Sequence, residues 1–192
     1  MNRLFIAFQH IVPQHLLSRC TGWLAELRHP AWLKDWVIGV FIAHFKVDMT
    51  EAAEPDHRRY ANFNAFFTRP LKAGARPIAD ADIVCPADGA ISQLGRINGG
   101  RVFQAKGRDY STFELLGADA ERAAQYANGS FATIYLSPRD YHRAHMPIAG
   151  RLTGTTYIPG DLYSVNATTA DNVERLFARN ERLVCYFATA AG

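Results

Sequence analysis

Two histidines, His142 and His145, are the residues whose type and spacing best suit chemistry. The unperturbed pKa of imidazole lies close to neutrality, so either side chain could accept and release protons under ordinary conditions. Two ring nitrogens are too few for a metal site, and no glutamate lies between them as in H-E-x-x-H. We therefore expect acid–base chemistry and no metal ion. The alternative is that the pair only caps a helix or fills space.

The segment around these histidines predicts a rigid mount for them. An apolar, strand-like run, Phe131–Leu136, precedes Ser137, which suits a helix N-cap, and Pro138, which suits the first helical position. Asp140 follows the cap at the third position, and Pro147 would end the helix. Residues i and i+3 share one face of a helix, so both imidazoles would point the same way.

A carboxylate and several polar side chains elsewhere are weaker candidates. Asp88 precedes a predicted strand and could orient an imidazole, as the acid does in Ser-His-Asp sites, although Asp-Gly is also an ordinary turn. The sequence alone does not place it beside His145. Arg69 and Lys72 could bind acidic groups or lie on a solvated surface. The turn 159–166 could line a polar pocket.

Composition limits the classes of protein that fit. The chain of 192 residues is 48% hydrophobic, enough for one domain with at most a small appendage. A net charge of +3 without a Lys/Arg run gives no support for nucleic-acid binding. The three cysteines are far apart and form no C-x-x-C, so neither a disulfide framework nor a structural zinc site is indicated, and a reducing, cytosolic setting fits best.

Residues 1–46 contain all three tryptophans, and their five Lys/Arg outnumber two acids. Pro13 and the His29-Pro30 pair divide this region into about three helices. Such helices suit a membrane interface, where they would lie flat, or a helical subdomain packed on the rest of the chain. The longest apolar run, Trp36–Ala43, is too short to span a membrane, and the N-terminus lacks a signal-peptide pattern.

Strand patterns begin near residue 83. Residues 90–97 and 101–105 flank Asn98-Gly-Gly100, which predicts a hairpin. Further strands are expected at 130–136, 151–158 and 182–189, with helix or loop at 112–127 and 168–178. The prediction is an α+β fold in which N-terminal amphipathic helices precede a mostly antiparallel β-sheet core that is incomplete at the C-terminus.

Six segments taken together resemble the phosphatidylserine decarboxylases. The resemblance runs from the N-terminal helices to about Phe187, and the segments that carry it are Phe63–Leu71, Pro86–Gly95, Gln104–Gly107, Tyr135–Pro147, Tyr157–Asn166 and Leu176–Arg182. It implies conversion of phosphatidylserine to phosphatidylethanolamine and CO2 through a Schiff base on a pyruvoyl group. Enzymes of this family form that group when the precursor cleaves itself before a serine.

The resemblance also implies roles for individual residues. Asp88 and His145 match the pair that activates the serine for self-cleavage, and His142 matches the residue that protonates the carbanion or assists decarboxylation. Tyr135 and Ser164 would lie near the headgroup. Residues 1–60 would form a membrane-interfacial helical segment on the cytoplasmic face of the cell membrane. Residues 61–192 would form part of the catalytic domain, partnered by a small pyruvoyl-bearing subunit from the same precursor.

One departure from the family qualifies these expectations. The cleavage motif Leu-Gly-Ser-Thr is absent from this sequence, and none of its serines matches the pyruvoyl precursor. We therefore expect the chain as given to be inactive alone. Two alternatives remain: a truncated pseudoenzyme that only binds anionic membrane, and a serine hydrolase using Asp88, His145 and a serine already present. No G-x-S-x-G motif supports the hydrolase.

Overall fold

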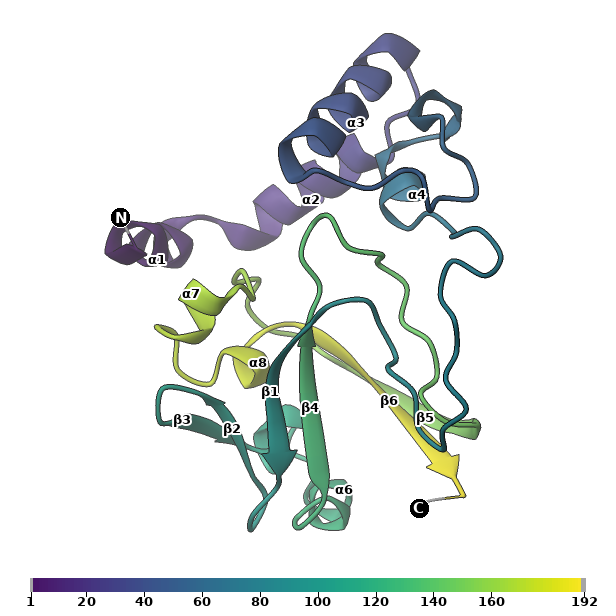
Figure 1. The fold of residues 1–192 in the computed structure, drawn as a ribbon. Helices are drawn as coiled ribbons and strands as arrows, with labels where there is room; N and C mark the ends of the chain where they lie inside the picture. The colour runs from purple at the N-terminus through teal and green to yellow at the C-terminus, as the bar shows by residue number, and fades with distance from the viewer. Residues whose placement is uncertain (1, 191–192) are drawn as a thin grey trace. The chain divides into compact units, whose positions relative to one another are not determined.

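Proline residues divide the N-terminal region into three helices in the computed structural model, which describes residues 2–190, with side chains over 4–190. The helices are α1 (Asn2–Ile11), α2 (Gln14–Ala25) and α3 (Ala31–Phe45), as predicted (Figure 1). Pro13 lies between the first two, and Pro30 is the N-cap of the third. No helix in the described chain is long and apolar enough to cross a membrane.

The chain forms two units, which are described separately. Unit 1 comprises Met1–Leu17, Ala90–Tyr135 and Gly150–Gly192, and unit 2 comprises Ser18–Gly89 and Leu136–Ala149. The sequence predicted a boundary at residue 60 between a membrane-interfacial segment and a catalytic domain. The two units are defined by packing and do not test that functional boundary, so it stays a prediction. The final two residues of the predicted segment 61–192 lie outside the described residues.

Aromatic packing forms the core of unit 2. The short helix α4 (Phe63–Phe67) has its N-cap at Asn62, whose side chain accepts a hydrogen bond from the Ala65 backbone N–H, and it follows the 3-10 turn η1 (His57–Arg59). Phe66 is fully buried, and Phe41 of α3 packs edge-to-face against it at 5.9 Å between ring centroids. The contact fixes α4 on α3.

Unit 1 contains the strands, which pair in three two-stranded antiparallel sheets. These are β1 (Ala90–Arg96) with β4 (Ser130–Tyr135), β2 (Arg101–Ala105) with β3 (Arg108–Ser111), and β5 (Gly150–Ile158) with β6 (Arg182–Thr189) (Figure 1). The connecting helices are α5 (Thr112–Leu115), α6 (Ala120–Gln125), α7 (Ala167–Ala170) and α8 (Leu176–Arg179). The predicted α+β class is confirmed.

The predicted hairpin between residues 90–97 and 101–105 is wrong, although both strands exist. Gly99 and Gly100 have positive φ angles and reverse the chain, but only one isolated bridge, Asn98 to Arg101, follows. β2 instead pairs with β3 across a second two-residue turn, Lys106-Gly107, in which both φ angles are positive. Both turns have positive φ angles at two successive residues, so the turn geometry does not decide between them, and β1 pairs with the distant β4.

A buried glutamine connects strand β2 to the segment between α7 and α8. Gln104 is 1% exposed, and its amide nitrogen donates to the carbonyls of Ala170 and Val173, both at 2.8 Å. Its amide oxygen accepts from the Leu176 backbone N–H, also at 2.8 Å. One side chain thus satisfies three backbone groups that are distant in sequence.

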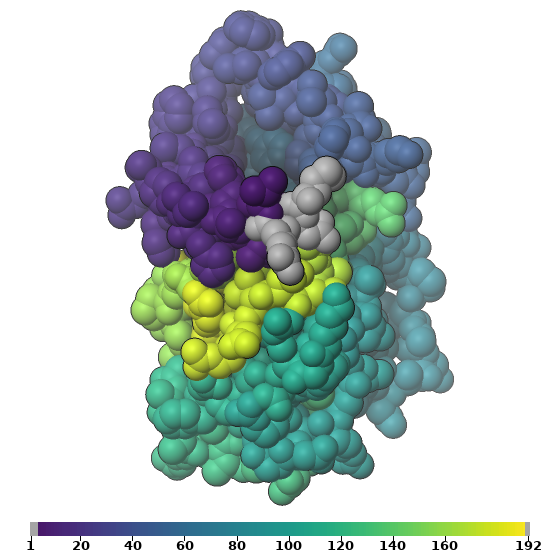
Figure 2. All heavy atoms as spheres, turned by 90° about the vertical axis from the view of Figure 1, so that its left-hand side faces the viewer, coloured from purple at the N-terminus to yellow at the C-terminus, as the bar shows by residue number. Residues whose placement is uncertain are grey.

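Within unit 1, polar side chains of helix α1 bind the segment that contains Tyr163 and Ser164. Gln9 accepts a hydrogen bond from the Ser164 backbone N–H at 2.8 Å, and His10 Nδ1 lies 2.6 Å from the Tyr163 hydroxyl. Figure 2 shows α1, in dark purple, against the yellow-green segment that includes these residues. The apolar side chains Leu4, Phe8 and Ile11 remain more than half exposed.

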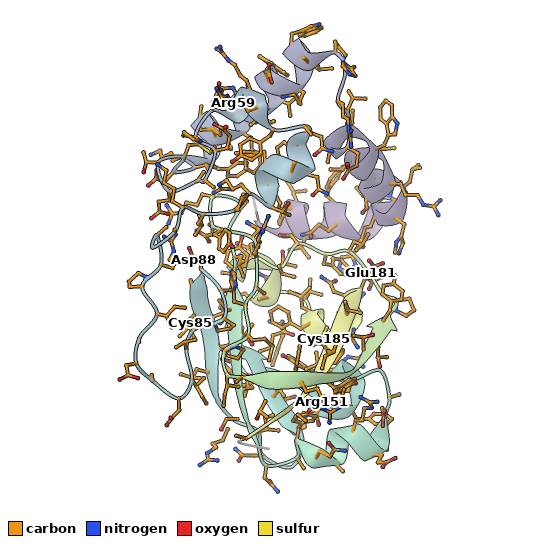
Figure 3. All side chains as sticks on the ribbon, turned by 90° about the vertical axis from the view of Figure 1, so that its right-hand side faces the viewer. Arg59, Cys85, Asp88, Arg151, Glu181 and Cys185 are labelled. Carbon is orange, nitrogen blue, oxygen red and sulfur yellow. The ribbon has the colours of Figure 1, made fainter. Side chains whose placement is uncertain are left out.

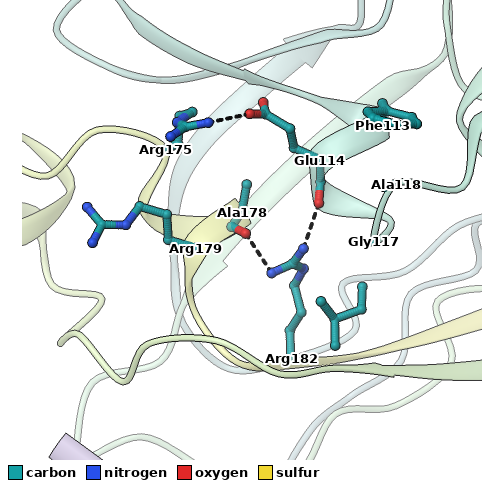
Figure 4. Close-up of a pocket in the computed structure, with 9 residues that line it drawn as sticks. Phe113, Glu114, Gly117, Ala118, Arg175, Ala178, Arg179 and Arg182 are labelled. Atoms are coloured by element: carbon teal, nitrogen blue, oxygen red, sulfur yellow. Dashed lines mark hydrogen bonds and ion pairs between the residues drawn. The ribbon is translucent and has the colours of Figure 1, made fainter.

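A capping box and an ion pair hold the junction at which β3 runs directly into α5. Ser111 and Glu114 exchange hydrogen bonds through side chain and backbone, and Glu114 also accepts from Arg175 at 2.6 Å (Figure 4). These donors hold the pKa of the Glu114 carboxyl below its usual range.

Replacing Gln104 with leucine should leave three buried backbone groups without partners. We expect the free energy of unfolding to fall by roughly 2–4 kcal/mol in urea denaturation. Gln125→Leu, at an exposed position of α6, is the matched control and should cost little. Equal effects of the two substitutions would contradict the bracing role of Gln104.

The lowered pKa of Glu114 predicts an acid-dependent loss of stability. A carboxyl group with a depressed folded-state pKa stabilises the fold above its ordinary value of about 4.5, and this contribution disappears as the pH falls through the folded-state pKa. Glu114→Gln should therefore lower the melting temperature at pH 7 and flatten its decline below about pH 4.5. The exposed Glu121→Gln control should leave the pH profile unchanged.

Candidate active site

A pocket of about 670 Å³ in unit 2 contains two of the predicted site residues, Asp88 and His145. Tyr141 also lines it, and Ile83 and Met146 contribute to apolar walls. Asp88 and Cys85 lie on the segment that leads into β1 (Figure 3). The pocket therefore combines an imidazole, a phenol and a carboxylate with hydrophobic surface, as ligand-binding sites commonly do.

Backbone hydrogen bonds bring the two segments of this pocket together. The N–H of His145 donates to the Pro86 carbonyl at 2.7 Å, and the N–H of Val84 donates to the Pro147 carbonyl at 2.9 Å. Residues 84–88 and 145–147 thus lie side by side although they are about sixty positions apart. The sequence showed each segment but contained no signal for this pairing.

The imidazole of His145 faces Tyr141. Its Nε2 lies 3.0 Å from the Tyr141 hydroxyl, and the two rings stack at 5.6 Å between centroids with an interplanar angle of 22°. The histidine side chain is exposed, so the ring is accessible to a ligand in the pocket. Tyr141 was not predicted, although its position four residues before His145 in the same segment was available from the sequence.

Asp88 is paired with an arginine in this structure and has no hydrogen bond to His145. Arg76 Nε donates to the Asp88 carboxylate at 2.7 Å, while its two terminal nitrogens bind Glu51 at 2.9 and 2.7 Å. The two carboxylates raise the pKa of Arg76, so its charge is permanent. The structure brings Asp88 and His145 into one pocket, and the orienting role of Asp88 stays a prediction.

The predicted helix over residues 137–147 is wrong. The Asp140 carboxylate accepts from the Ser137 N–H at 2.6 Å and from its hydroxyl at 2.8 Å, but the Asp140 N–H donates to the Ser137 backbone carbonyl at 2.9 Å rather than to its side chain. The chain then continues as a single turn followed by extended backbone. The hydrogen bonds between Ser137 and Asp140 therefore close a single turn, and no helix follows it.

His142 consequently differs from His145 in its surroundings. Its ring packs on Phe67 at 4.0 Å between centroids, and its Nδ1 lies 2.8 Å from the Asp140 carbonyl. A carbonyl only accepts, so Nδ1 carries the hydrogen and Nε2 is the atom that can exchange a proton. His142 does not line the pocket of His145, and the expected shared face is absent.

Tyr135 and Ser164 lie in unit 1. Tyr135 ends β4 and pairs with Ala90, and the backbone N–H of Ser164 is held by Gln9. The structure therefore groups the three candidate acid–base residues in one unit and the two candidate headgroup residues in the other. No group of three His, Cys, Asp or Glu side chains suited to a metal occurs within residues 2–190.

Two family models match parts of this chain. The sequence model described as phosphatidylserine decarboxylase matches residues 63–192, and a second, described as PSD, matches residues 4–46. The first match covers most of the chain and includes the whole histidine segment. The protein class is thus that of the carboxy-lyases, enzymes that release CO2 from their substrates.

Curated relatives specify the family within that class. The phosphatidylserine decarboxylase proenzyme of Ectopseudomonas mendocina is 59% identical over 100% of this chain and 67% of its own length. The proenzymes of Pseudomonas aeruginosa strain LESB58 and Chromobacterium violaceum are 58% and 60% identical, over 100% and 97% of this chain. The chain belongs to the phosphatidylserine decarboxylase family. It spans about two thirds of the length of these relatives, 66% for the latter two.

Proposed function

We propose that this chain supplies the acid–base residues of an enzyme that converts phosphatidylserine to phosphatidylethanolamine and CO2. The observation that supports this most directly is the pocket in which Asp88, Tyr141 and His145 meet. The family relationship supports the choice of reaction and substrate. The relatives are proenzymes by name, which supports a self-processed precursor.

The family implies a pyruvoyl group, derived from a serine that this sequence does not contain. When bound, such a group supplies a ketone that takes up the electrons left behind by the departing CO2. The residues present fit it, because His145 and Tyr141 offer hydrogen-bonding atoms in a pocket with apolar walls. His145 and Asp88 would hold its precursor serine, and Tyr141 would fix the imidazole.

His145 is the proposed general base for self-cleavage. Its accessible ring has a hydroxyl partner at 3.0 Å, so its nitrogen is already placed at hydrogen-bonding distance from an O–H group. Asp88 would orient and stabilise the resulting imidazolium, as the acid does in a catalytic triad. That role requires Asp88 to exchange part of its interaction with Arg76 for one with His145.

His142 is the proposed proton donor in the decarboxylation step. With Nδ1 fixed by the Asp140 carbonyl, protonated Nε2 is free to deliver a proton to the carbon that loses CO2. Packing on Phe67 restricts the ring. Tyr135 and Ser164 are proposed to contact the serine headgroup, and no role is assigned to the remaining polar residues of the turn 159–166.

The tryptophan-bearing helices are proposed to dock on the cytoplasmic face of the cell membrane. Trp23, Trp32 and Trp36 are 68%, 70% and 62% exposed, unusual values for such large aromatic side chains. Tryptophan prefers the membrane interface, where its ring is partly buried and its N–H stays hydrated. The small pyruvoyl-bearing subunit is the second proposed partner.

The activity is tested by measuring release of CO2 from vesicles containing carboxyl-labelled phosphatidylserine. The protein should be purified from its native source and its intact mass determined alongside. Release of CO2 by a preparation that contains a second, pyruvoyl-blocked chain would support the proposal. Vesicle binding without CO2 release, by a single species of 21.4 kDa, would favour the alternative of a membrane-binding pseudoenzyme.

Substitution of the two histidines should separate two steps. In the precursor that contains this chain and the cleavage site, His145→Ala should slow self-cleavage by at least about 100-fold, because the general base is removed. His142→Ala should cleave normally and then decarboxylate about 100-fold more slowly. Gel electrophoresis measures the first step and CO2 release the second. Normal cleavage of the His145 variant would refute its assignment, and His15→Ala is the control.

Removal of exposed tryptophans should weaken vesicle binding. The double variant Trp32→Ser, Trp36→Ser should bind vesicles of anionic phospholipid at least about tenfold less tightly, since each side chain contributes interfacial area. Sedimentation with vesicles measures this. Leu94→Ser removes a similarly exposed apolar side chain, 68% exposed, from strand β1 and should have no effect. Equal losses would contradict docking through the helices.

A further inference from the structure

Arg69 is a buried cation with no carboxylate partner. The residue is 3% exposed, yet the structure contains no ion pair to it among residues 2–190. Its Nε has no hydrogen-bond partner, and its Nη2 makes only a long contact, 3.4 Å, with the Arg139 carbonyl. Its guanidinium also lies 5.4 Å from the centre of the Phe66 ring. Burial lowers the pKa of Arg69, which reflects the cost of this arrangement.

A partly buried arginine shows how the same fold satisfies a guanidinium completely. Arg182 in unit 1 donates to four backbone carbonyls at 2.6–2.8 Å, two of which are visible in Figure 4; the acceptors belong to Glu114, Leu115, Ala178 and Asn180. Every donating nitrogen of Arg182 therefore has a near partner. Arg69 lacks this compensation, so an external acceptor is the missing element.

Arg69 lines a second pocket in unit 2, of about 260 Å³, together with Lys46 and Arg139. Lys46 is exposed and forms no ion pair within the part of the chain that the structure describes. Arg139 has only a distant carboxylate contact, with Asp140 at 3.7 Å. Three cationic side chains at this pocket thus retain donors for a ligand.

The acidic side chains of the same pocket are engaged elsewhere. Asp48 accepts from Thr50, Glu51 and Asp88 share Arg76, and Asp140 accepts from Ser137. The acids therefore do not neutralise Arg69 by direct contact. They balance the overall charge of the pocket, which suits a ligand that carries an ammonium group as well as an oxyanion.

We propose that Arg69, with Lys46 and Arg139, binds the phosphodiester of the phospholipid headgroup on which the enzyme acts. A guanidinium matches phosphate oxygens in a fork of parallel hydrogen bonds. The pocket shares Leu71, Asp88 and Tyr141 with the pocket of His145, so the two are adjacent within unit 2. The choice of ligand rests on the proposed function, whereas the oxyanion site itself does not.

Thermal unfolding with soluble ligands tests the site directly. Inorganic phosphate or O-phosphoserine at tenfold above its dissociation constant should raise the melting temperature by roughly 3–6 °C over sodium chloride of equal ionic strength. L-serine, which has a carboxylate and an ammonium but no phosphate, should give no shift. A shift with L-serine equal to that with phosphoserine would overturn the assignment to phosphate.

Substitutions show whether the phosphate-induced rise in melting temperature depends on Arg69 and Lys46. Arg69→Met should abolish the phosphate shift without lowering the melting temperature of the ligand-free protein, because an uncompensated buried charge is removed. A purely structural arginine would show the reverse, a lower starting temperature with the shift retained. Lys46→Met should reduce the phosphate-induced rise in melting temperature by at least about half. Because Lys46 is exposed, this substitution should not impair folding. Arg59→Met deletes a surface charge outside the pocket and should retain the full shift.

Kinetics distinguishes failure of this proposal from failure of the proposed function. In the processed enzyme, Lys46→Met should raise KM for phosphatidylserine in mixed vesicles by about tenfold with kcat nearly unchanged. An unchanged KM in an active enzyme would overturn the headgroup assignment alone. If phosphate stabilises a protein that releases no CO2, the oxyanion site is supported and the decarboxylase proposal is refuted.

Discussion

The pairing of residues 84–86 with residues 145–147 is the constraint on which the candidate site depends. Two backbone hydrogen bonds, from His145 to Pro86 and from Val84 to Pro147, bring an imidazole and a carboxylate from distant parts of the sequence into one pocket. Backbone groups carry this pairing, so it tolerates changes of side chain on either segment. The Tyr141 hydroxyl then contacts the imidazole of His145, and Arg76 donates to the carboxylate of Asp88.

Charge compensation differs between the two units and explains much of the remaining structure. In unit 1, the buried Gln104 and the partly buried Arg182 bind backbone carbonyls, and they connect segments that lack a shared sheet. In unit 2, Arg76 bridges two carboxylates while Arg69 has none. Arg182 and Arg76 thus have their partners within the chain, whereas Arg69, which has no carboxylate partner among the described residues, lines a pocket that shares Asp88 and Tyr141 with the candidate active site.

Local signals in the sequence predicted the elements well, and non-local pairing was the part that could not be predicted. Prolines marked the ends of the N-terminal helices, and apolar runs marked the strands, because both depend on neighbouring residues. The hairpin at Asn98–Gly100 failed because a turn signal reports only a local chain reversal, and β1 pairs with β4, which is distant in sequence. The helix at Ser137 failed because a capping signal also closes an isolated turn. His145 and Asp88 were candidates from residue type and local pattern, and the family resemblance supplied their roles, whereas Arg76 and Glu51 had no local signal.

His145 combines a fixed main chain with an exposed ring, and this combination determines how fast the imidazole can change partners. The main-chain N–H is held by Pro86, so the Cα position is set, while only two side-chain torsions orient the ring. Rotamer exchange of an exposed side chain takes picoseconds to nanoseconds, far less than a loop movement. The ring can therefore leave Tyr141 for another hydroxyl and return without any rearrangement of the backbone. A single histidine on such a mount can serve successive proton transfers at different atoms, with reorientation never limiting the rate.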